Sequence, residues 1–432
     1  MKNSKKLFLF RNAKHQDVFD EMVNIIADVE NGEFEKDVVD RVYEVVYKLI
    51  ELAGHYGFAG NIWHNFIAFI IAHNENAFSL QCEIGGEPSE SLTPIVMQDC
   101  KVFFNLINYD LKSIDKELDI SAFELLENHA VRKNDTSKVF NERIRDCIYN
   151  LALVLEEAND AQDYYDIIKI FYNKYGVGDL GLHKAYRLKD EPENSDNVLA
   201  LIDPITNTES ISFDDLVGYE LQKEKLIKNT EDFLKGKAAN NVLLYGDSGT
   251  GKSSSVKALL NTYYDEGLRI IEVYKHQFKL LARVIEKIKD RNYKFIIFMD
   301  DLSFEEYEIE YKYLKAVIEG GIAVKPDNVL IYATSNRRHL VREKWSDKDE
   351  QHEDLHTSDT VQEKLSLSAR FGLQIYYGSP LKKEYEQIVL ELAKKHGIEM
   401  PDNELLAEAN KWMVSHGGPS GRTAKQLINH LK

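Results

Sequence analysis

The sequence predicts an α/β module, built on a five-stranded parallel sheet with a C-terminal helical lid and preceded by an all-α N-terminal domain. Three observations predict this class. Apolar residues recur at helical spacing from residue 15 to about residue 178, short apolar runs alternate with helical segments after residue 240, and a glycine-rich motif follows the first of those runs. With 432 residues the chain exceeds what one core usually holds, so we expect at least two domains.

The N-terminal domain is expected to span residues 1–188. Between Val38 and Leu49, for example, apolar side chains recur at three- and four-residue steps, as a half-buried helix requires. Residues 1–200 carry 21 Lys and Arg against 35 Asp and Glu, so −14 of the chain's net charge of −18 lies in this part. Because the domain contains no motif of its own, we expect it to recognise an unidentified protein partner.

The composition argues against several classes of protein. A net charge of −18 lacks the positive field that non-specific binding of nucleic acid requires, so a nucleic-acid partner is not supported by charge. The three cysteines are odd in number and form no C-x-x-C motif, which disfavours a disulfide framework and a thiolate zinc site. No apolar run has the length of a signal peptide or a membrane span, so we expect a cytoplasmic protein without a membrane partner.

Residues 189–204 are expected to link the domains, because KDEPENSDN is polar and contains Pro192. The α/β core should then span residues 205–378. Its strands are indicated by apolar runs without polar alternation, which suits strands covered on both faces of a parallel sheet. These runs are NVLLYG (241–246), LRIIEVY (268–274), KFIIFMD (294–300), VLIYATS (329–335) and LQIYYG (373–378). Residues 379–432 have only helical patterns and are expected to form the lid.

The most specific motif is GDSGTGKS, which satisfies the phosphate-binding pattern G-x-x-x-x-G-K-[ST] between a predicted strand and a predicted helix. Its backbone N–H groups can surround the phosphates of ATP, and the following helix N-terminus adds partial positive charge. Lys252 is expected to reach the β- and γ-phosphates from an exposed position, and Ser253 to ligate Mg²⁺. The cofactor-binding residues expected in this loop are Gly246, Ser248, Gly249, Thr250, Gly251, Lys252, Ser253 and Ser254.

Two carboxylates end the predicted strand KFIIFMDD. A nucleotide site of this kind needs a carboxylate on a neighbouring strand to hold the metal through water and another to orient the attacking water. We expect Asp300 to serve the metal and Asp301 to orient the water. Glu305 is a second candidate for the water, and the alternative for all of these residues is that they cap the next helix.

Together these motifs resemble an AAA+ ATPase. Within that superfamily the chain resembles a group of bacterial ATP-binding proteins known only as a domain of unknown function, and the resemblance covers roughly residues 205–432. The segment FDDLVGYELQKEKL resembles the one that cups the adenine, which implies that Val217, Gly218 and Tyr219 lie near the base. Asp301 departs from the family, where most relatives carry a glutamate.

Three further positions follow from the resemblance. Asn336 in ATSN resembles the sensor 1 residue that contacts the γ-phosphate or the attacking water, and Arg422 in SGRTAKQL resembles sensor 2 in the lid. Arg370 in LSARFG resembles the arginine that reaches into a neighbouring subunit, which implies a homo-oligomer. Taken singly, Asn336 could cap a loop and Arg422 could pair with a carboxylate. Three other arginines compete with Arg370, namely Arg337, Arg338 and Arg342.

The polar insert 346–360 contains HEDLH, which matches the zinc-protease pattern H-E-x-x-H. Only Leu355 is apolar in its surroundings, so a helix there would have no face to bury and could not hold ligands rigidly. We interpret the segment as a solvated acidic loop.

The function expected from these residues is ATP hydrolysis with Mg²⁺ that remodels or regulates a protein or nucleic-acid partner. The alternative is a nucleotide-dependent switch with little or no hydrolysis, which the shorter side chain of Asp301 favours.

Overall fold

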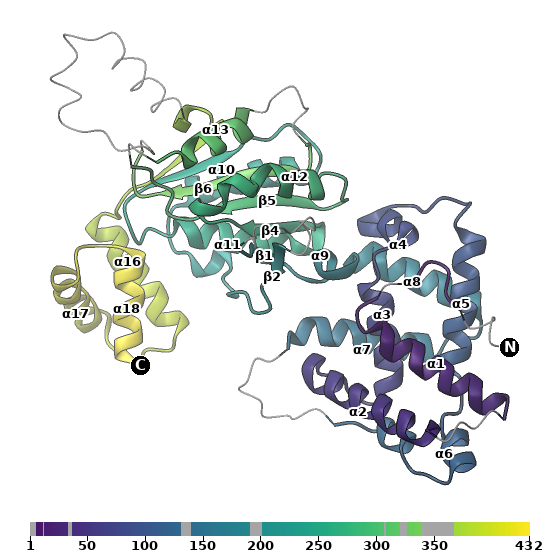
Figure 1. Cartoon of the computed structure of the whole chain (residues 1–432). Helices are drawn as coiled ribbons and strands as arrows, with labels where there is room; N and C mark the ends of the chain where they lie inside the picture. The colour runs from purple at the N-terminus through teal and green to yellow at the C-terminus, as the bar shows by residue number, and fades with distance from the viewer. Residues whose placement is uncertain are drawn as a thin grey trace. The chain divides into compact units, whose positions relative to one another are not determined.

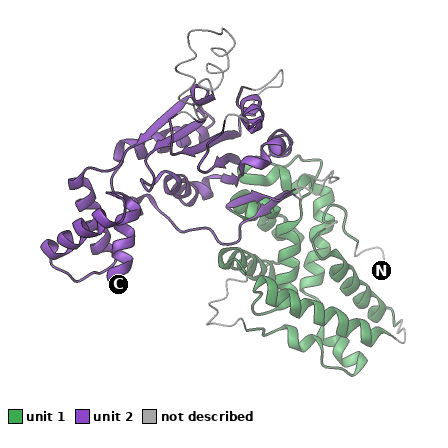
Figure 2. Cartoon of the chain, turned by 60° about the vertical axis from the view of Figure 1, so that its left-hand side comes forward, with its two compact units in different colours: residues 1–183 green, residues 184–432 purple. Residues whose placement is uncertain are grey.

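The computed structural model describes residues 6–11, 13–32, 37–130, 140–190, 201–305, 308–319, 326–338, 340 and 367–432. The chain divides into two compact units, unit 1 over residues 1–183 and unit 2 over residues 184–432 (Figure 2). Among the described helices, none combines the length and the apolar character that crossing a membrane requires.

Unit 1 consists of helices packed around one apolar core. Its elements are α1 (Gln16–Glu30), α2 (Val38–Tyr56), α3 (Ile62–His73), α4 (Ala77–Cys82), η1 (Glu83–Gly85), α5 (Thr93–Ile107), α6 (Lys112–Leu118), η2 (Phe123–Leu126), α7 (Glu142–Glu156), α8 (Ala161–Tyr175) and α9 (Gly178–Leu182). Helix α3 is buried on nearly all sides and contacts α2, α5 and α7, so it is the central helix of the unit.

The start of α3 is well determined by local chemistry. The Asn61 side chain accepts a hydrogen bond from the backbone N–H of His64, which satisfies one of the free donors of the first turn. Two residues into the helix, the Trp63 indole donates to the Leu106 carbonyl at 3.1 Å, so this buried ring keeps a polar partner at the end of α5. The first turn of α3 is thereby tied to the end of α5.

Unit 2 is built on a seven-stranded sheet in the order β2-β1-β4-β5-β6-β3-β7. The strands are β1 (Ala185–Leu188), β2 (Ile202–Pro204), β3 (Val242–Gly246), β4 (Leu268–Glu272), β5 (Lys294–Met299), β6 (Val329–Ser335) and β7 (Leu373–Tyr377). The five predicted strands are β3 to β7, and all of their pairings are parallel. The register pairs Leu244 of β3 with Thr334 of β6 and with Ile375 of β7.

Two strands were not predicted. Strand β1 pairs in parallel with β4, and β2 pairs with β1 in antiparallel fashion, so seven strands replace the five expected. Residues of β1 lie in the stretch assigned to the helical domain, and β2 lies in the expected linker. Both strands have at most four residues, and the burial along β2 is incomplete, so neither leaves a long apolar run in the sequence.

Helices cover the sheet and form the lid (Figure 1). Those of the core are η4 (Phe213–Asp215), α10 (Glu220–Leu234), α11 (Lys252–Tyr263), η5 (Tyr264–Glu266), η6 (Lys275–Leu280), α12 (Leu281–Ile288) and α13 (Glu310–Glu319). The lid consists of α16 (Lys382–Lys395), α17 (Asp402–Ser415) and α18 (Gly421–Leu431), packed around an apolar cluster of their own. A mostly parallel sheet with β3 between β6 and β7, followed by a helical lid, confirms the predicted AAA+ fold class.

Candidate functional site

The glycine-rich loop follows β3 and ends where α11 begins at Lys252. Its conformation requires glycine, because Gly249 has φ of 77° and Gly251 has φ of 92°, both in the left-handed region. The N-terminus of α11 therefore opens directly from the loop and directs its partial positive charge and unpaired N–H groups toward it. This geometry suits an anionic ligand such as a phosphate chain.

Lys252 is buried, with 7% of its surface exposed, whereas the sequence led us to expect an exposed charge. Its ammonium group donates to the Gly246 carbonyl at 2.9 Å, the Asp247 carbonyl at 2.6 Å and the Asn336 Oδ1 at 3.1 Å. The long side chain folds back over its own loop because these acceptors replace water around the charge. Burial is also the main cause that lowers the pKa of Lys252.

A cluster of oxygen atoms joins the loop to the neighbouring strands. The Asp300 Oδ1 accepts from the Ser253 hydroxyl at 2.5 Å and from the Thr334 hydroxyl at 2.6 Å. Carboxylate and hydroxyl oxygens are the ligands that Mg²⁺ prefers, usually one or two from the protein with phosphate and water completing the octahedron. No group of three or more His, Cys, Asp or Glu side chains suited to a metal occurs among the described residues.

Asp301 and Asn336 form a second polar pair beside this cluster. The Asn336 Nδ2 donates to Asp301 Oδ1 at 2.7 Å, while the Asn336 Oδ1 accepts from Lys252. Asp301 has φ of 51°, a conformation that non-glycine residues rarely adopt, and its backbone N–H donates to the Thr334 hydroxyl at 2.9 Å. The left-handed backbone thus occurs at a residue whose carboxylate faces the candidate site.

Helix α18 of the lid meets the loop through Arg422. Its backbone N–H donates to the Gly249 carbonyl at 3.2 Å, and its guanidinium donates to the Ser248 hydroxyl at 3.3 Å. A side chain at position 249 would meet the Arg422 Cβ at 3.0 Å and atoms of Ser420 nearby, so glycine allows this close approach. The lid arginine therefore lies directly over the loop.

The segment before α10 closes another side. Val217 packs against the apolar cluster of the lid, and the Tyr219 ring stacks on Tyr377 with centroids 5.2 Å apart. The Tyr219 hydroxyl donates to the Gly378 carbonyl at 2.8 Å, and burial is the main cause that raises its pKa to about 12. Tyr219 also has φ of 61°, and Gly218 before it has φ of 82°. An apolar and aromatic wall thus stands beside the polar loop.

These groups surround one cavity of about 600 Å³, which is in the size class of small-ligand pockets. Of the residues predicted from the sequence, those that line it are Val217, Tyr219, Ser248, Gly249, Thr250, Gly251, Lys252, Ser253, Ser254, Asp300, Asp301, Asn336 and Arg422. Gly218 and Gly246 adjoin the lining without belonging to it. A polar loop, four candidate catalytic or metal side chains and an aromatic wall therefore meet in one space.

Two further predicted residues also lie outside this lining, Glu305 and Arg370. The backbone N–H of Glu305 donates to a carboxylate oxygen of Glu308, while Arg370 forms an ion pair with Glu319 on α13. The two described competitors, Arg337 and Arg338, have exposed side chains. Arg342 and the HEDLH motif lie outside the described residues.

The sequence analysis missed several residues that line the cavity or adjoin its lining. Asp247 shapes the loop, since its Oδ2 accepts from the backbone N–H and the hydroxyl of Ser379, at 2.8 and 2.9 Å. These hydrogen bonds are the main cause that lowers the pKa of Asp247. Thr334 precedes Asn336 by two residues in ATSN, so its hydroxyl at the end of a predicted strand could have been recognised from the sequence as part of the site. Apolar lid residues such as Ile388 and Leu392 carried none, because a buried helix face looks alike in any domain.

Comparisons with known proteins identify a family that the second part of the chain matches. The family model described as "Protein of unknown function (DUF815)" matches residues 183–432. No curated protein sequence matches the chain at a significant level.

Among solved structures, a mutant of RuvB from Thermotoga maritima is 17% identical with a TM-score of 0.35, covering 51% of this chain and 64% of that chain. The match thus spans less than two thirds of that RuvB chain. The FIGL-1 AAA domain in complex with ADP is 18% identical with a TM-score of 0.36, covering 52% of this chain and 73% of that chain.

The contact between Asp215 and Lys395 predicts a pH-dependent stability. The Lys395 ammonium donates to the Asp215 carboxylate and is the first cause that lowers its pKa from 3.8 to about 2. A depressed carboxylate pKa stabilises the folded state above the unfolded pKa, and this stabilisation is lost as the pH falls from about 4 to about 2. As the pH falls from about 4 to about 2, the free energy of unfolding of Lys395→Gln should therefore decrease less than that of the wild type. Urea unfolding at several pH values measures this difference.

Lys394→Gln is the matched control, because it removes the same charge from the neighbouring position of α16. It should retain the acid-dependent loss of the wild type. If Lys395→Gln and Lys394→Gln behave alike, the ion pair with Asp215 does not set the acid response.

Proposed function

The chain belongs to the family of proteins of unknown function named DUF815. We propose that unit 2 binds ATP with Mg²⁺ and hydrolyses the ATP. In this proposal, hydrolysis serves to remodel or regulate a protein or nucleic-acid partner. The observation that carries the proposal is the convergence of Lys252, Ser253, Asp300, Asp301 and Arg422 on one cavity. A phosphate chain needs cations, N–H donors and a metal with oxygen ligands, and each of these requirements has a residue there.

In this proposal the phosphates lie over the loop between β3 and α11. Lys252 turns from the loop carbonyls to the β- and γ-phosphates, which offer it full negative charges in place of carbonyl dipoles. Arg422, already over Ser248, contributes a second cation from the lid. Val217 and Tyr219 supply the apolar wall against which the adenine packs, and Gly218 lets the backbone turn between them.

Ser253 and Asp300 are the residues that would hold Mg²⁺, Ser253 directly and Asp300 through water. The ion would supply positive charge that offsets the charge developing on the transferred phosphoryl group. The support is that the two side chains already share a hydrogen bond of 2.5 Å, and that Thr334 fixes the orientation of the carboxylate from the neighbouring strand. Both side chains offer hard oxygen atoms, the kind that Mg²⁺ and its bound water prefer.

Hydrolysis needs a water molecule aligned with the γ-phosphate. We assign its orientation to the carboxylate of Asp301 and its second contact to the amide of Asn336, since both line the cavity beside Lys252. Glu305 is the weaker candidate, because it lies outside the cavity lining. The reaction is in-line attack of water on phosphorus, with the protein supplying alignment and charge.

A second function is favoured by one specific observation. The carboxylate of Asp301 is one methylene shorter than that of glutamate, and it is engaged by Asn336 at 2.7 Å. A carboxylate held in this way reaches less far toward a water molecule. The chain would then act as a switch that binds ATP, changes conformation and hydrolyses slowly. Phosphate release, measured with and without candidate partners, separates the two functions.

Assembly and partner choice complete the proposal. Arg370 lies outside the cavity of its own chain, which suits an arginine that acts on a neighbouring copy in a homo-oligomer. Residues 1–200 carry −14 of the net charge, so the helical unit is the part that we assign to a basic protein partner. We place the protein in the cytoplasm on the sequence patterns described above.

Lys252→Met is expected to weaken ATP binding by about tenfold or more, because hydrogen bonds to charged groups contribute roughly 1.5–3 kcal/mol each. Methionine keeps most of the aliphatic stem, so the buried packing is largely retained. Calorimetric titration with Mg·ATP measures the effect. Lys257→Met on the same helix is the control and should bind ATP normally, since Lys257 pairs with Glu209 outside the cavity. Equal ATP affinity of both variants would contradict the assignment of Lys252.

Asp301→Asn is expected to keep ATP bound while lowering turnover by about 10²–10⁴, the range typical of a lost general base. The amide retains the size of the side chain but loses the charge that orients water. Phosphate release and ATP binding are measured on the same sample. Glu305→Gln, the matched change at the competing position, should turn over nearly normally. The reverse outcome would assign the water to Glu305.

Arg370→Ala is expected to bind ATP but to lose turnover by about 10³–10⁵, as for other arginines that act in trans. Mixing it with Lys252→Met should restore part of the activity, because one mixed interface combines an intact loop with an intact arginine. Arg337→Ala, a change of the same charge, should retain activity and serves as the control. No recovery in mixtures shown to co-assemble would exclude an action of Arg370 in trans.

A further inference from the structure

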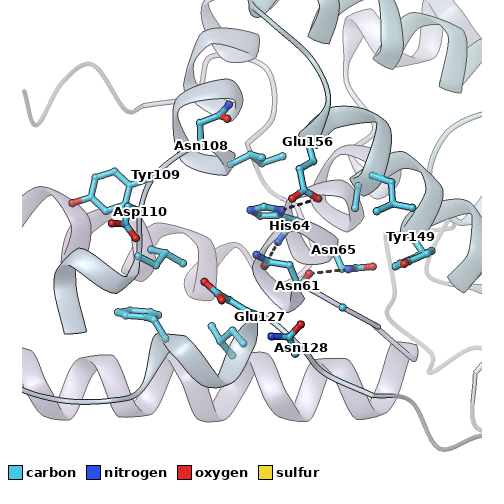
Figure 3. Close-up of a pocket in the computed structure, with 17 residues that line it drawn as sticks. Asn61, His64, Asn65, Asn108, Tyr109, Asp110, Glu127, Asn128, Tyr149 and Glu156 are labelled. Atoms are coloured by element: carbon cyan, nitrogen blue, oxygen red, sulfur yellow. Dashed lines mark hydrogen bonds and ion pairs between the residues drawn. The ribbon is translucent and has the colours of Figure 1, made fainter. Parts of the chain in front are cut away.

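Unit 1 contains a polar cavity of about 520 Å³ that has no part in the nucleotide site. It lies between the start of α3, the turn after α5, η2 and the second half of α7. Figure 3 shows side chains from these segments around one space. Asn61, His64 and Asn65 lie close together on one side of it, and Asp110 and Glu127 lie on other sides. The cavity is large enough for a small organic group.

One buried acceptor lies in the wall of this cavity. Asn65 is only 2% exposed, and its Nδ2 donates to the carbonyls of Ala59 and Asn61, both at 2.8 Å. These two carbonyls accept only, so they fix the orientation of the amide and leave its Oδ1 as the remaining polar atom. No donor among the described residues hydrogen bonds to that oxygen. A buried carbonyl oxygen without a donor is costly, so the wall is built to receive an N–H group.

The charge of the lining points to a cation. Three carboxylates line the cavity, Asp110, Glu127 and Glu156, and its described lining contains no Lys or Arg. His64 also lines the cavity, with its Nδ1 3.6 Å from Glu156 Oε2. Burial, the largest influence, lowers the pKa of His64, so its ring is uncharged near neutral pH and adds no cation. Lys112, outside the lining, pairs with Glu127 at 2.7 Å and also interacts with Asp110, whose Oδ1 accepts from its backbone N–H. Among the described residues, the ion-pair contact of Glu156 is with the uncharged His64, so its charge is the one left for a cation in the cavity.

We propose that this cavity binds a guanidinium group, the side chain of arginine in a protein partner. The group has five N–H donors in a planar fork, enough to supply the Asn65 oxygen and to pair with a carboxylate of the lining such as Glu156. An ammonium group offers its three donors from one point and matches separated acceptors less well. Phe123, Leu126 and Leu153 supply apolar surface for the aliphatic stem.

The proposal deepens the assignment of partner recognition to the acidic helical unit, but it does not require ATP binding or hydrolysis. It turns a general attraction between charges into one defined contact. A partner that lacks an exposed arginine would then bind only through the weak, salt-sensitive field of the unit.

The test uses the full chain and two tripeptides, acetyl-Gly-Arg-Gly-amide and its citrulline counterpart, observed by saturation-transfer NMR up to several millimolar. Citrulline keeps the shape of arginine but replaces the guanidinium with a neutral urea. We expect the arginine peptide to bind at least about tenfold more tightly, the difference typical of a charge-assisted hydrogen bond. Agmatine is added in a separate titration. Tighter binding of the peptide assigns the site to a protein side chain, and tighter binding of agmatine assigns it to a free guanidinium compound.

Glu156→Gln is expected to weaken the arginine peptide about tenfold, whereas Glu157→Gln should leave its affinity unchanged. Both changes remove one charge from adjacent exposed positions of the same helix end, but only Glu156 lines the cavity. Equal losses in the two variants, equal binding of arginine and citrulline, or no saturation transfer from either guanidinium compound would overturn the proposal. ATP affinity serves as an independent reading, since it should not change in either variant.

Discussion

The close approach of two strand ends determines how unit 2 is arranged around its cavity. At the end of β3, a Cβ on Gly246 would lie 2.1 Å from the Tyr377 carbonyl of β7, so only glycine fits. The next residue, Asp247, donates its backbone N–H to that carbonyl at 3.0 Å and receives two hydrogen bonds from Ser379. The Tyr377 ring in turn stacks on Tyr219. This one backbone contact thus positions the glycine-rich loop, the aromatic wall at Tyr219 and the start of the lid at Ser379.

Much of this architecture could be predicted from the sequence, because its signals are local. The phosphate-loop motif and the strand runs depend on neighbouring residues, and the parallel order brings Asp300 and Asn336 to the same sheet edge as Lys252. The two added strands could not be predicted, because β1 and β2 are short and gain their hydrogen bonds from a distant edge. The burial of Lys252 was likewise hidden, since it depends on the Asn336 amide 84 positions away.

The two units carry opposite kinds of polar cavity. In unit 2, donors and cations surround a glycine-rich loop beside the carboxylates of Asp300 and Asp301, while in unit 1 the polar walls have carboxylates and no Lys or Arg among the described lining residues. The first arrangement suits an anion and the second a cation. The acidic residues of positions 1–200 therefore do more than give this part a negative net charge, because some of them gather around one cavity.

The amide of Asn336 has a consequence for which side chains position 336 can hold. Its oxygen accepts from Lys252 while its nitrogen donates to Asp301, so one planar group presents opposite polarity to a cation and an anion. Aspartate at this position would repel Asp301, and leucine would serve neither neighbour. Serine has a single atom for both contacts and a shorter reach. Among side chains of this size, only the carboxamide has two ends of different sign, so this position should tolerate almost no substitution in a library screened for a working site.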